Sequence, residues 1–133
     1  MTTIDPLSQP RRIADRGAAS DLFAPLADEQ VEVVAIVYLD RDQRVLGMRH
    51  ARSSSNSVLD LPIRAIAADA LAFDAAGVVM AHNHPSGDPT PSVADRDATR
   101  RLARALQVLD VRLLDHLVVA RGGIASFRAL GLL

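Results

Sequence analysis

Blocks of apolar residues of strand length alternate along this chain of 133 residues with blocks that have a helical period. A short run rich in Val, Ile and other apolar residues, bounded by turn-forming residues, is typical of a buried strand. By this criterion the sequence predicts strands over residues 31–39, 44–52, 77–81, 111–120 and 124–127. The turns at residues 40–43 and at Gly122-Gly123 are short enough to join their flanking strands as antiparallel hairpins.

Three segments show the apolar spacing of helices that pack one face on a core. Residues 11–26 predict a short helix, and Pro62 suits the first turn of a helix that runs to about Phe73. The core face of this second helix is expected to be Ile63, Ile66, Ala67 and Leu71. The strongest pattern runs from Ser92 to Leu109. Its core face is expected to be Ala98, Leu102, Leu106 and Leu109.

Strands that alternate with helices and also pair in hairpins predict a mixed sheet with helices packed on it. The expected fold class is therefore α/β, a three-layer α/β/α arrangement with a mixed central sheet. Residues 11–133 are expected to form a single domain, because a chain of this size suits one core. Residues 1–10 are polar with two prolines and are expected to be a flexible N-terminus, and residues 53–57 a polar loop or a worn edge strand.

Composition limits the chemistry more than it limits the fold. Apolar residues make up 49% of the chain and charged residues 23%, and the net charge of −1 argues for neither a nucleic-acid nor a membrane partner. No apolar run reaches the length of a membrane span, and residues 1–20 lack the apolar centre of a signal peptide, which favours a cytoplasmic location. Cysteine is absent, so a metal site would have to use His, Asp, Glu and water.

The segment with the clearest chemistry is residues 81–95, AHNHPSGDPTPSVAD. His82 and His84 stand two positions apart at the end of a predicted strand, so their imidazoles point to the same side. A loop with three prolines and a glycine then turns the chain back, and Asp95 lies in the first turn of the following helix. Two neutral imidazoles and one carboxylate, with a fourth position left for water, are a suitable ligand set for Zn²⁺.

Each part of this pattern also has a purely structural interpretation. His-x-His alone is a weak signal, the Pro-Gly stretch can be only a turn, and Ser92-Val93-Ala94-Asp95 has the form of a capping box. The joint spacing favours the metal site. Rival His-x-His families fit poorly: amidohydrolase barrels need a far longer chain, and a cupin site normally has a Glu soon after the second His, whereas no Glu follows Glu32.

The spacing His82-x-His84-Pro85, then six residues, then Ser92-x-x-Asp95 resembles the JAMM metal motif of JAB/MPN metallopeptidases. The full string from His82 to Ser92 is closer still to bacterial RadC-like proteins, and the resemblance covers residues 30–131. It implies a JAB/MPN domain of cytidine-deaminase-like fold in which His82, His84 and Asp95 bind Zn²⁺. It also implies a zinc-dependent peptidase or isopeptidase that acts on a peptide or protein substrate.

The same resemblance implies a general base, because the superfamily uses a glutamate at the head of a buried strand. Glu32 opens the apolar run 33–39 and lies 50 positions before His82. It would take a proton from a metal-activated water. A solvated strand-end residue is the alternative interpretation of Glu32, and Glu29 is the weaker candidate base. Ser92 would donate a hydrogen bond to the oxyanion, a role that competes with helix capping.

Three further polar residues have weaker interpretations. Asp115 and His116 are candidates for residues that support the metal ligands or the fold, and a hydrogen-bonded core histidine is the favoured interpretation of His116. His50 belongs to no motif and is expected to be exposed. RadC-like proteins often carry an N-terminal segment that resembles helix-hairpin-helix DNA-binding modules, which is not expected within this chain. Their Pro-Arg-Glu before the metal strand is replaced here by Pro62-Ile63-Arg64.

Three functions therefore compete. The presence of the full motif favours a hydrolase over a metal-binding interaction module with little turnover. A nucleic-acid-associated protein is the third candidate, because Arg96, Arg100 and Arg104 form one helical stripe with Arg101 beside it. Such a stripe is usually a solvated face, and Asp97 is expected to pair with Arg101 one turn away.

Overall fold

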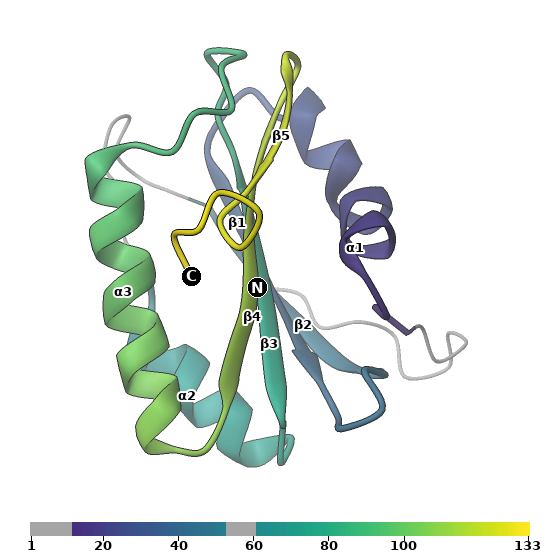
Figure 1. Ribbon diagram of the computed structural model, residues 1–133, viewed down its shortest axis with the longest axis vertical. Coiled ribbons are helices and arrows are strands. Elements are labelled where there is room, and N and C mark those ends of the chain that lie inside the picture. The colour runs from purple at the N-terminus through teal and green to yellow at the C-terminus, as the bar shows by residue number, and fades with distance from the viewer. Residues whose placement is uncertain (1–11, 53–60) are drawn as a thin grey trace.

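The computed structural model describes residues 12–52 and 61–133 (Figure 1). The predictions for residues 1–10 and 53–57 lie outside the described residues. In chain order the elements are α1 (Arg16–Phe23), the 3₁₀ helix η1 (Ala24–Asp28), β1 (Val33–Leu39), β2 (Val45–Arg52), α2 (Ile63–Ala72), β3 (Gly77–Asn83), α3 (Val93–Val108), β4 (Arg112–Ala120) and β5 (Gly123–Ser126).

The strands form a mixed sheet in the order β2-β1-β3-β4-β5. β1 pairs antiparallel with β2 and with β3, and β4 pairs antiparallel with β5. β3 and β4 are parallel and are joined through α3, because parallel neighbours need a crossover connection. The carboxyl ends of β3 and β4 therefore lie at the same edge of the sheet as the amino end of β1.

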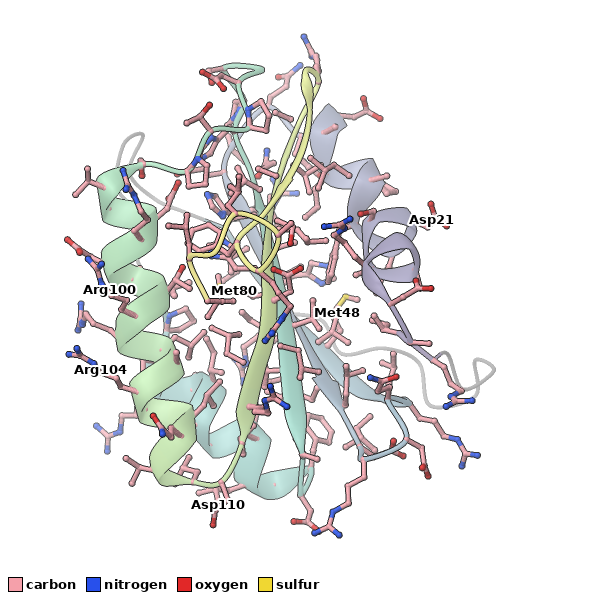
Figure 2. The ribbon with its side chains drawn as sticks, in the orientation of Figure 1. Asp21, Met48, Met80, Arg100, Arg104 and Asp110 are labelled. Atoms are coloured by element: carbon pink, nitrogen blue, oxygen red, sulfur yellow. The ribbon has the colours of Figure 1, made fainter. Side chains whose placement is uncertain are left out.

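Helices cover both faces of this sheet, which confirms the predicted α/β/α layers (Figure 1). α2 and α3 pack on one face through a core that includes Ile66 and Leu102. α1 and η1 pack on the other face, where Phe23 is buried. Two methionines mark the layers in Figure 2: Met80 lies between the sheet and α3, and Met48 between the sheet and α1.

The central strands β1 and β3 are buried along their whole length. Successive side chains of β1 enter opposite cores, with Val34 and Ile36 on the α3 side and Val33 and Ala35 on the α1 side. A strand buried on both faces is apolar at every position, which explains the continuous apolar run at this place in the sequence. Such a run identifies the strand, and pairing with its neighbours decides which side chains face which helix.

The first helix differs from its predicted bounds of 11–26. It begins after Asp15, whose carboxylate accepts a hydrogen bond from Ala18 N at 2.8 Å, and it ends at Phe23. The chain then tightens into η1, because Pro25 has no N–H with which to continue the α-helical bonding. Within the described ranges, no helix combines the length and the apolar character needed to cross a membrane.

Three side-chain predictions are wrong. Leu71 is 62% exposed, because Ile66 and Ala70 form the buried face of α2. His50 is half-buried in β2. Asp97 pairs with Arg100, three positions on, and not with Arg101.

Asp69 of α2 ties the helix to the two neighbouring strands β1 and β2. Its carboxylate accepts hydrogen bonds from the Tyr38 hydroxyl at 2.6 Å, from Arg49 Nε, and from Arg49 Nη2 at 2.7 Å. The bond from Arg49, helped by Tyr38, holds the pKa of Asp69 below its usual value against the opposing effect of burial. Burial, followed by the hydrogen bond to the Asp69 carboxylate, raises the pKa of Tyr38.

Replacing Asp69 by Asn is expected to lower the free energy of unfolding by about 1.5–3 kcal/mol, the range for hydrogen bonds to a charged group. The pKa of Asp69 is lower in the folded than in the unfolded chain. The ionised Asp69 therefore contributes fully to folding stability above the unfolded-state pKa of about 3.9. This contribution is lost as the pH falls through the folded-state pKa. Urea titrations at several pH values should therefore show a smaller acid destabilisation in the variant. Asp74→Asn, at an exposed position just after α2, is the matched control. Equal stability of the two variants at pH 7 would contradict this role.

Candidate metal centre

His82 and His84 lie at the carboxyl end of β3, and both rings turn toward α3. Their Nε2 atoms are 3.0 Å apart. The chain stays attached to the sheet past β3, since His84 N donates to the carbonyl of Val119 in β4 at 2.9 Å. His84 Nδ1 lies 2.9 Å from the carbonyl oxygen of Asp88, which can only accept, so Nδ1 carries the proton and a neutral His84 has its lone pair on Nε2.

Asp95 joins the histidines from the first turn of α3. Its Oδ2 atom lies 3.0 Å from His84 Nε2, and its Oδ1 atom 3.2 Å from His82 Nε2. The same carboxylate accepts a bond from Ser92 N at 2.8 Å, while Ser92 Oγ accepts from Asp95 N at 3.0 Å. The predicted capping box is thus confirmed, and one carboxylate both caps the helix and faces the two imidazoles.

The charges of this group depend on one another. Burial alone would raise the pKa of Asp95, but the close contacts of its oxygens with the His82 and His84 rings outweigh this effect and hold the pKa far below its usual range. The hydrogen bond with Asp95, reinforced by the Asp88 carbonyl, raises the pKa of His84. The pocket therefore presents an ionised carboxylate and favours a positive charge beside it.

Glu32 reaches the same place from the segment just before β1. Antiparallel pairing sets Val34 opposite His82, which brings the amino end of β1 to the end of β3. Glu32, His82 and His84 each offer a ligand atom, and the three atoms lie within 4.8 Å of one another. Among the described residues, Glu32 Oε2 is the buried side-chain oxygen that has no hydrogen-bond partner. Glu29, the weaker candidate, points instead to Arg52 at 3.9 Å.

Asn83, the residue between the two histidines, fixes the segment that carries Glu32. Its Oδ1 accepts from Val33 N at 2.6 Å, and its Nδ2 donates to the carbonyls of Glu29 and Val31 at 3.2 and 2.9 Å. The prediction from the sequence missed this role. A polar residue inside a strand buried on both faces is a signal that could have indicated it, because such a side chain must find partners.

The five predicted site residues are thus brought together. Ser92 is exposed at the N-cap, and its hydroxyl oxygen accepts from Asp95 N, which leaves its own proton available for donation. Capping and oxyanion binding therefore use different parts of the Ser92 hydroxyl and are compatible.

His116 of β4 lies behind the two histidines and is completely buried. Its Nε2 atom is 2.6 Å from His82 Nδ1, and its Nδ1 atom is 2.7 Å from Thr99 Oγ1 of α3. The ring stacks on Phe127 with centroids 4.4 Å apart. Burial, helped by the neighbouring His82, holds the pKa of His116 well below its usual value. Both ring nitrogens have partners, as expected for a core histidine.

Asp115 holds the end of the sheet together. Its carboxylate accepts from the Ser126 hydroxyl at 2.6 Å and from Arg128 N at 3.1 Å, which ties β4 to β5 and to the turn that follows. These contacts favour the structural interpretation of Asp115. Thr99, in contrast, was missed by the sequence analysis, because only folding brings it against β4.

The donor set fits a zinc ion. In a tetrahedral site with Zn–N and Zn–O bonds of about 2.0–2.1 Å, neighbouring donors are about 3.3–3.4 Å apart. The separations of 3.0 Å between His82 and His84 Nε2, and of 3.0 and 3.2 Å from these atoms to Asp95, are close to that value. The unpartnered Glu32 oxygen and the ionised Asp95 supply the negative charge that a divalent cation needs.

A glycine in the turn between β4 and β5 holds the loop that follows His84. Gly122 N donates to the carbonyl of Gly87 at 3.0 Å. A Cβ atom at Gly122 would lie 2.6 Å from that same backbone oxygen, closer than non-bonded contact allows. Only glycine permits this approach without moving the loop.

A mixed sheet between helices, with a His-x-His pair where a strand ends and an aspartate in the next helix, is consistent with a JAB/MPN-like fold. The chain belongs to the RadC-like JAB domain family, which it matches over residues 13–132.

Several curated relatives of the chain are named as UPF0758 proteins. UPF0758 protein Mpe_A2695 of Methylibium petroleiphilum is 45% identical over 109 residues, which cover 81% of this chain and 49% of the relative. A UPF0758 protein of Thiobacillus denitrificans is 39% identical over 127 residues, covering 96% of this chain and 54% of the relative. UPF0758 protein YfjY of Escherichia coli is 41% identical over 117 residues, covering 87% and 73%. The chain thus spans about half the length of the first two.

Gly122→Ala is expected to push the 84–89 loop away from β4 and to destabilise the chain by about 1–3 kcal/mol, the usual cost of overpacking. The matched control is Gly17→Ala in α1, where a new Cβ meets its nearest atom at 3.4 Å. Urea unfolding followed by circular dichroism compares the two. A Gly122→Ala chain as stable as the Gly17→Ala chain would show that the loop does not depend on this contact.

Proposed function

We propose that this chain is a zinc-dependent hydrolase of the JAMM type that cleaves a peptide or isopeptide bond in a peptide or protein substrate, in the cytoplasm. The observation that carries the proposal is the buried Glu32 oxygen without a partner, beside two imidazoles and an ionised carboxylate. An unsatisfied buried carboxylate oxygen costs free energy, and such costs are characteristic of functional sites.

Three residues are assigned as ligands and one as the base. His82, His84 and Asp95 would hold the ion, because their donor atoms lie 3.0–3.2 Å apart. Glu32 is assigned as the base, because its carboxylate lies within 4.8 Å of the ligand atoms of His82 and His84, near the place that a metal-bound water would take. When bound, zinc supplies the Lewis acidity that makes water a nucleophile near neutral pH.

The chain's own groups then move the protons. Glu32 takes a proton from the attacking water and passes it to the nitrogen of the leaving amine. The Ser92 hydroxyl donates a hydrogen bond to the oxygen that gains negative charge as the carbonyl is attacked. The carboxylate comes from the segment just before β1, and the hydroxyl comes from the N-cap of α3.

A metal-binding interaction module without turnover is the alternative. A site with three protein ligands and Glu32 outside them favours the enzyme, because the fourth zinc position stays open for water, whereas structural zinc sites are usually closed by four protein ligands. Nucleic acid is not part of the proposal: Arg100 and Arg104 point away from α3 into solvent (Figure 2), and Arg100 is paired with Asp97.

The purified protein is expected to bind about one zinc ion per chain, in line with a single three-ligand site. His82→Ala should abolish this binding, because it removes a completely buried donor, whereas His50→Ala, outside the site in β2, should keep it. Elemental analysis and zinc titration give the stoichiometry. A wild-type chain that holds no metal and takes up none on titration would overturn the proposal.

Glu32→Gln is expected to keep zinc and to lose about 10²–10⁴-fold in turnover, the usual contribution of a general base. Glutamine preserves the shape and removes the basicity. Glu29→Gln alters the other glutamate of the chain and should leave turnover unchanged. A library of internally quenched peptides, with isopeptide-linked members, supplies the substrates.

Loss of zinc from Glu32→Gln to the same extent as from His82→Ala would make Glu32 a ligand and refute its role as base. A zinc-loaded wild-type chain that cleaves no member of the library would favour the interaction module. Normal turnover by Glu32→Gln would assign the base to another residue.

A further inference from the structure

Hydrogen bonds connect Asp95, Thr99, His116 and His82 behind the candidate metal centre. One of these contacts determines which atom is the donor in each of the others. Thr99 Oγ1 lies 2.6 Å from the carbonyl oxygen of Asp95, one turn earlier in α3. A carbonyl only accepts, so the single hydroxyl proton of Thr99 is donated there. The lone pairs of Thr99 Oγ1 remain, and His116 Nδ1 at 2.7 Å must therefore be the donor of the next bond.

The direction passes through the His116 ring to His82. His116 is completely buried between Thr99, His82 and Phe127, and neither hydrogen-bonding partner of its ring is an acid that would stabilise a positive charge there. A neutral ring with its proton on Nδ1 has a bare Nε2. That atom lies 2.6 Å from His82 Nδ1, so His82 Nδ1 carries the proton and donates it.

This tautomer decides the state of His82 Nε2, the ring nitrogen that faces Asp95. A neutral His82 with its proton on Nδ1 has its only lone pair on Nε2, the atom 3.2 Å from Asp95 and 3.0 Å from His84 Nε2. The chain of bonds starts at the Asp95 backbone and ends beside the Asp95 carboxylate. It runs from α3 through β4 to β3.

We propose that Thr99 and His116 are positioning residues for the metal site: together they fix the tautomer and the ring orientation of His82, so that its Nε2 lone pair is presented to the ion. This inference rests on the proposed function, because it assumes a metal bound at His82. Metal-binding histidines generally donate their other ring N–H to a partner that orients them. In this chain that partner is a second histidine, itself oriented by a threonine on the helix that supplies Asp95.

Two nearly isosteric variants at Thr99 test the role. Thr99→Val keeps the shape and removes the hydroxyl, while Thr99→Ser keeps the hydroxyl. Competition with a chromophoric chelator measures zinc affinity, which is expected to fall about 10–100-fold in Thr99→Val and to stay close to wild type in Thr99→Ser. Ser126→Ala, which removes a buried hydroxyl of β5, is the control for general destabilisation and should bind zinc normally.

Long-range ¹H–¹⁵N spectra of the histidine rings show which ring nitrogen carries the proton. A role of Thr99 and His116 in stability alone would not require a particular tautomer of His116. His116 is expected to carry its proton on Nδ1, with bare Nε2, in both the metal-free and the zinc-loaded wild-type chain. A proton on His116 Nε2 overturns the proposal, and this measurement decides the matter even if Thr99→Val fails to fold.

The outcomes separate the two proposals. Equal zinc affinity of wild type and Thr99→Val overturns the positioning role and leaves the proposed function intact. A wild-type chain that binds no zinc overturns both. Weak binding by Thr99→Val, rescue by Thr99→Ser and the Nδ1 tautomer of His116 together support the positioning role.

Discussion

One carboxylate holds the functional end of this molecule together. Asp95 is 2% exposed, and an ionised group at such depth is stable only when its oxygens are satisfied. It meets that condition by capping its own helix and by facing two histidines from another element. Asp95 therefore links the start of α3 to the histidines at the end of β3.

The sheet supplies the opposite wall of the site. Because β1 runs antiparallel to β3, its amino end arrives where β3 finishes, and Asn83 binds the backbone just before β1. Glu32 is held there with one oxygen unpartnered, an arrangement that costs about 1–3 kcal/mol for a buried polar group. The fold thus tolerates a local loss of stability at the point where its acidic and imidazole groups meet.

Much of this was predictable from local sequence, and the exceptions have physical reasons. The histidine pair follows from strand alternation, and Asp95 from the spacing of a capping box, since both patterns depend on near neighbours in the chain. Thr99 and Asn83 were missed because their partners come from other elements. Leu71 was placed wrongly because helical spacing alone does not say which of two adjacent apolar residues the sheet will cover.

The proline-rich loop between the histidines and Asp95 determines how much the chain would have to reorganise to bind a metal ion. Pro85, Pro89 and Pro91 restrict the backbone before any ligand arrives, and Gly122 anchors the loop to the sheet. Little conformational entropy is left to be lost when the donors close around a cation. In small zinc domains, by contrast, the metal must fold the chain that binds it. Here the donors are already in place without an ion, so a metal bound at the proposed site would be exchangeable while the protein stays folded.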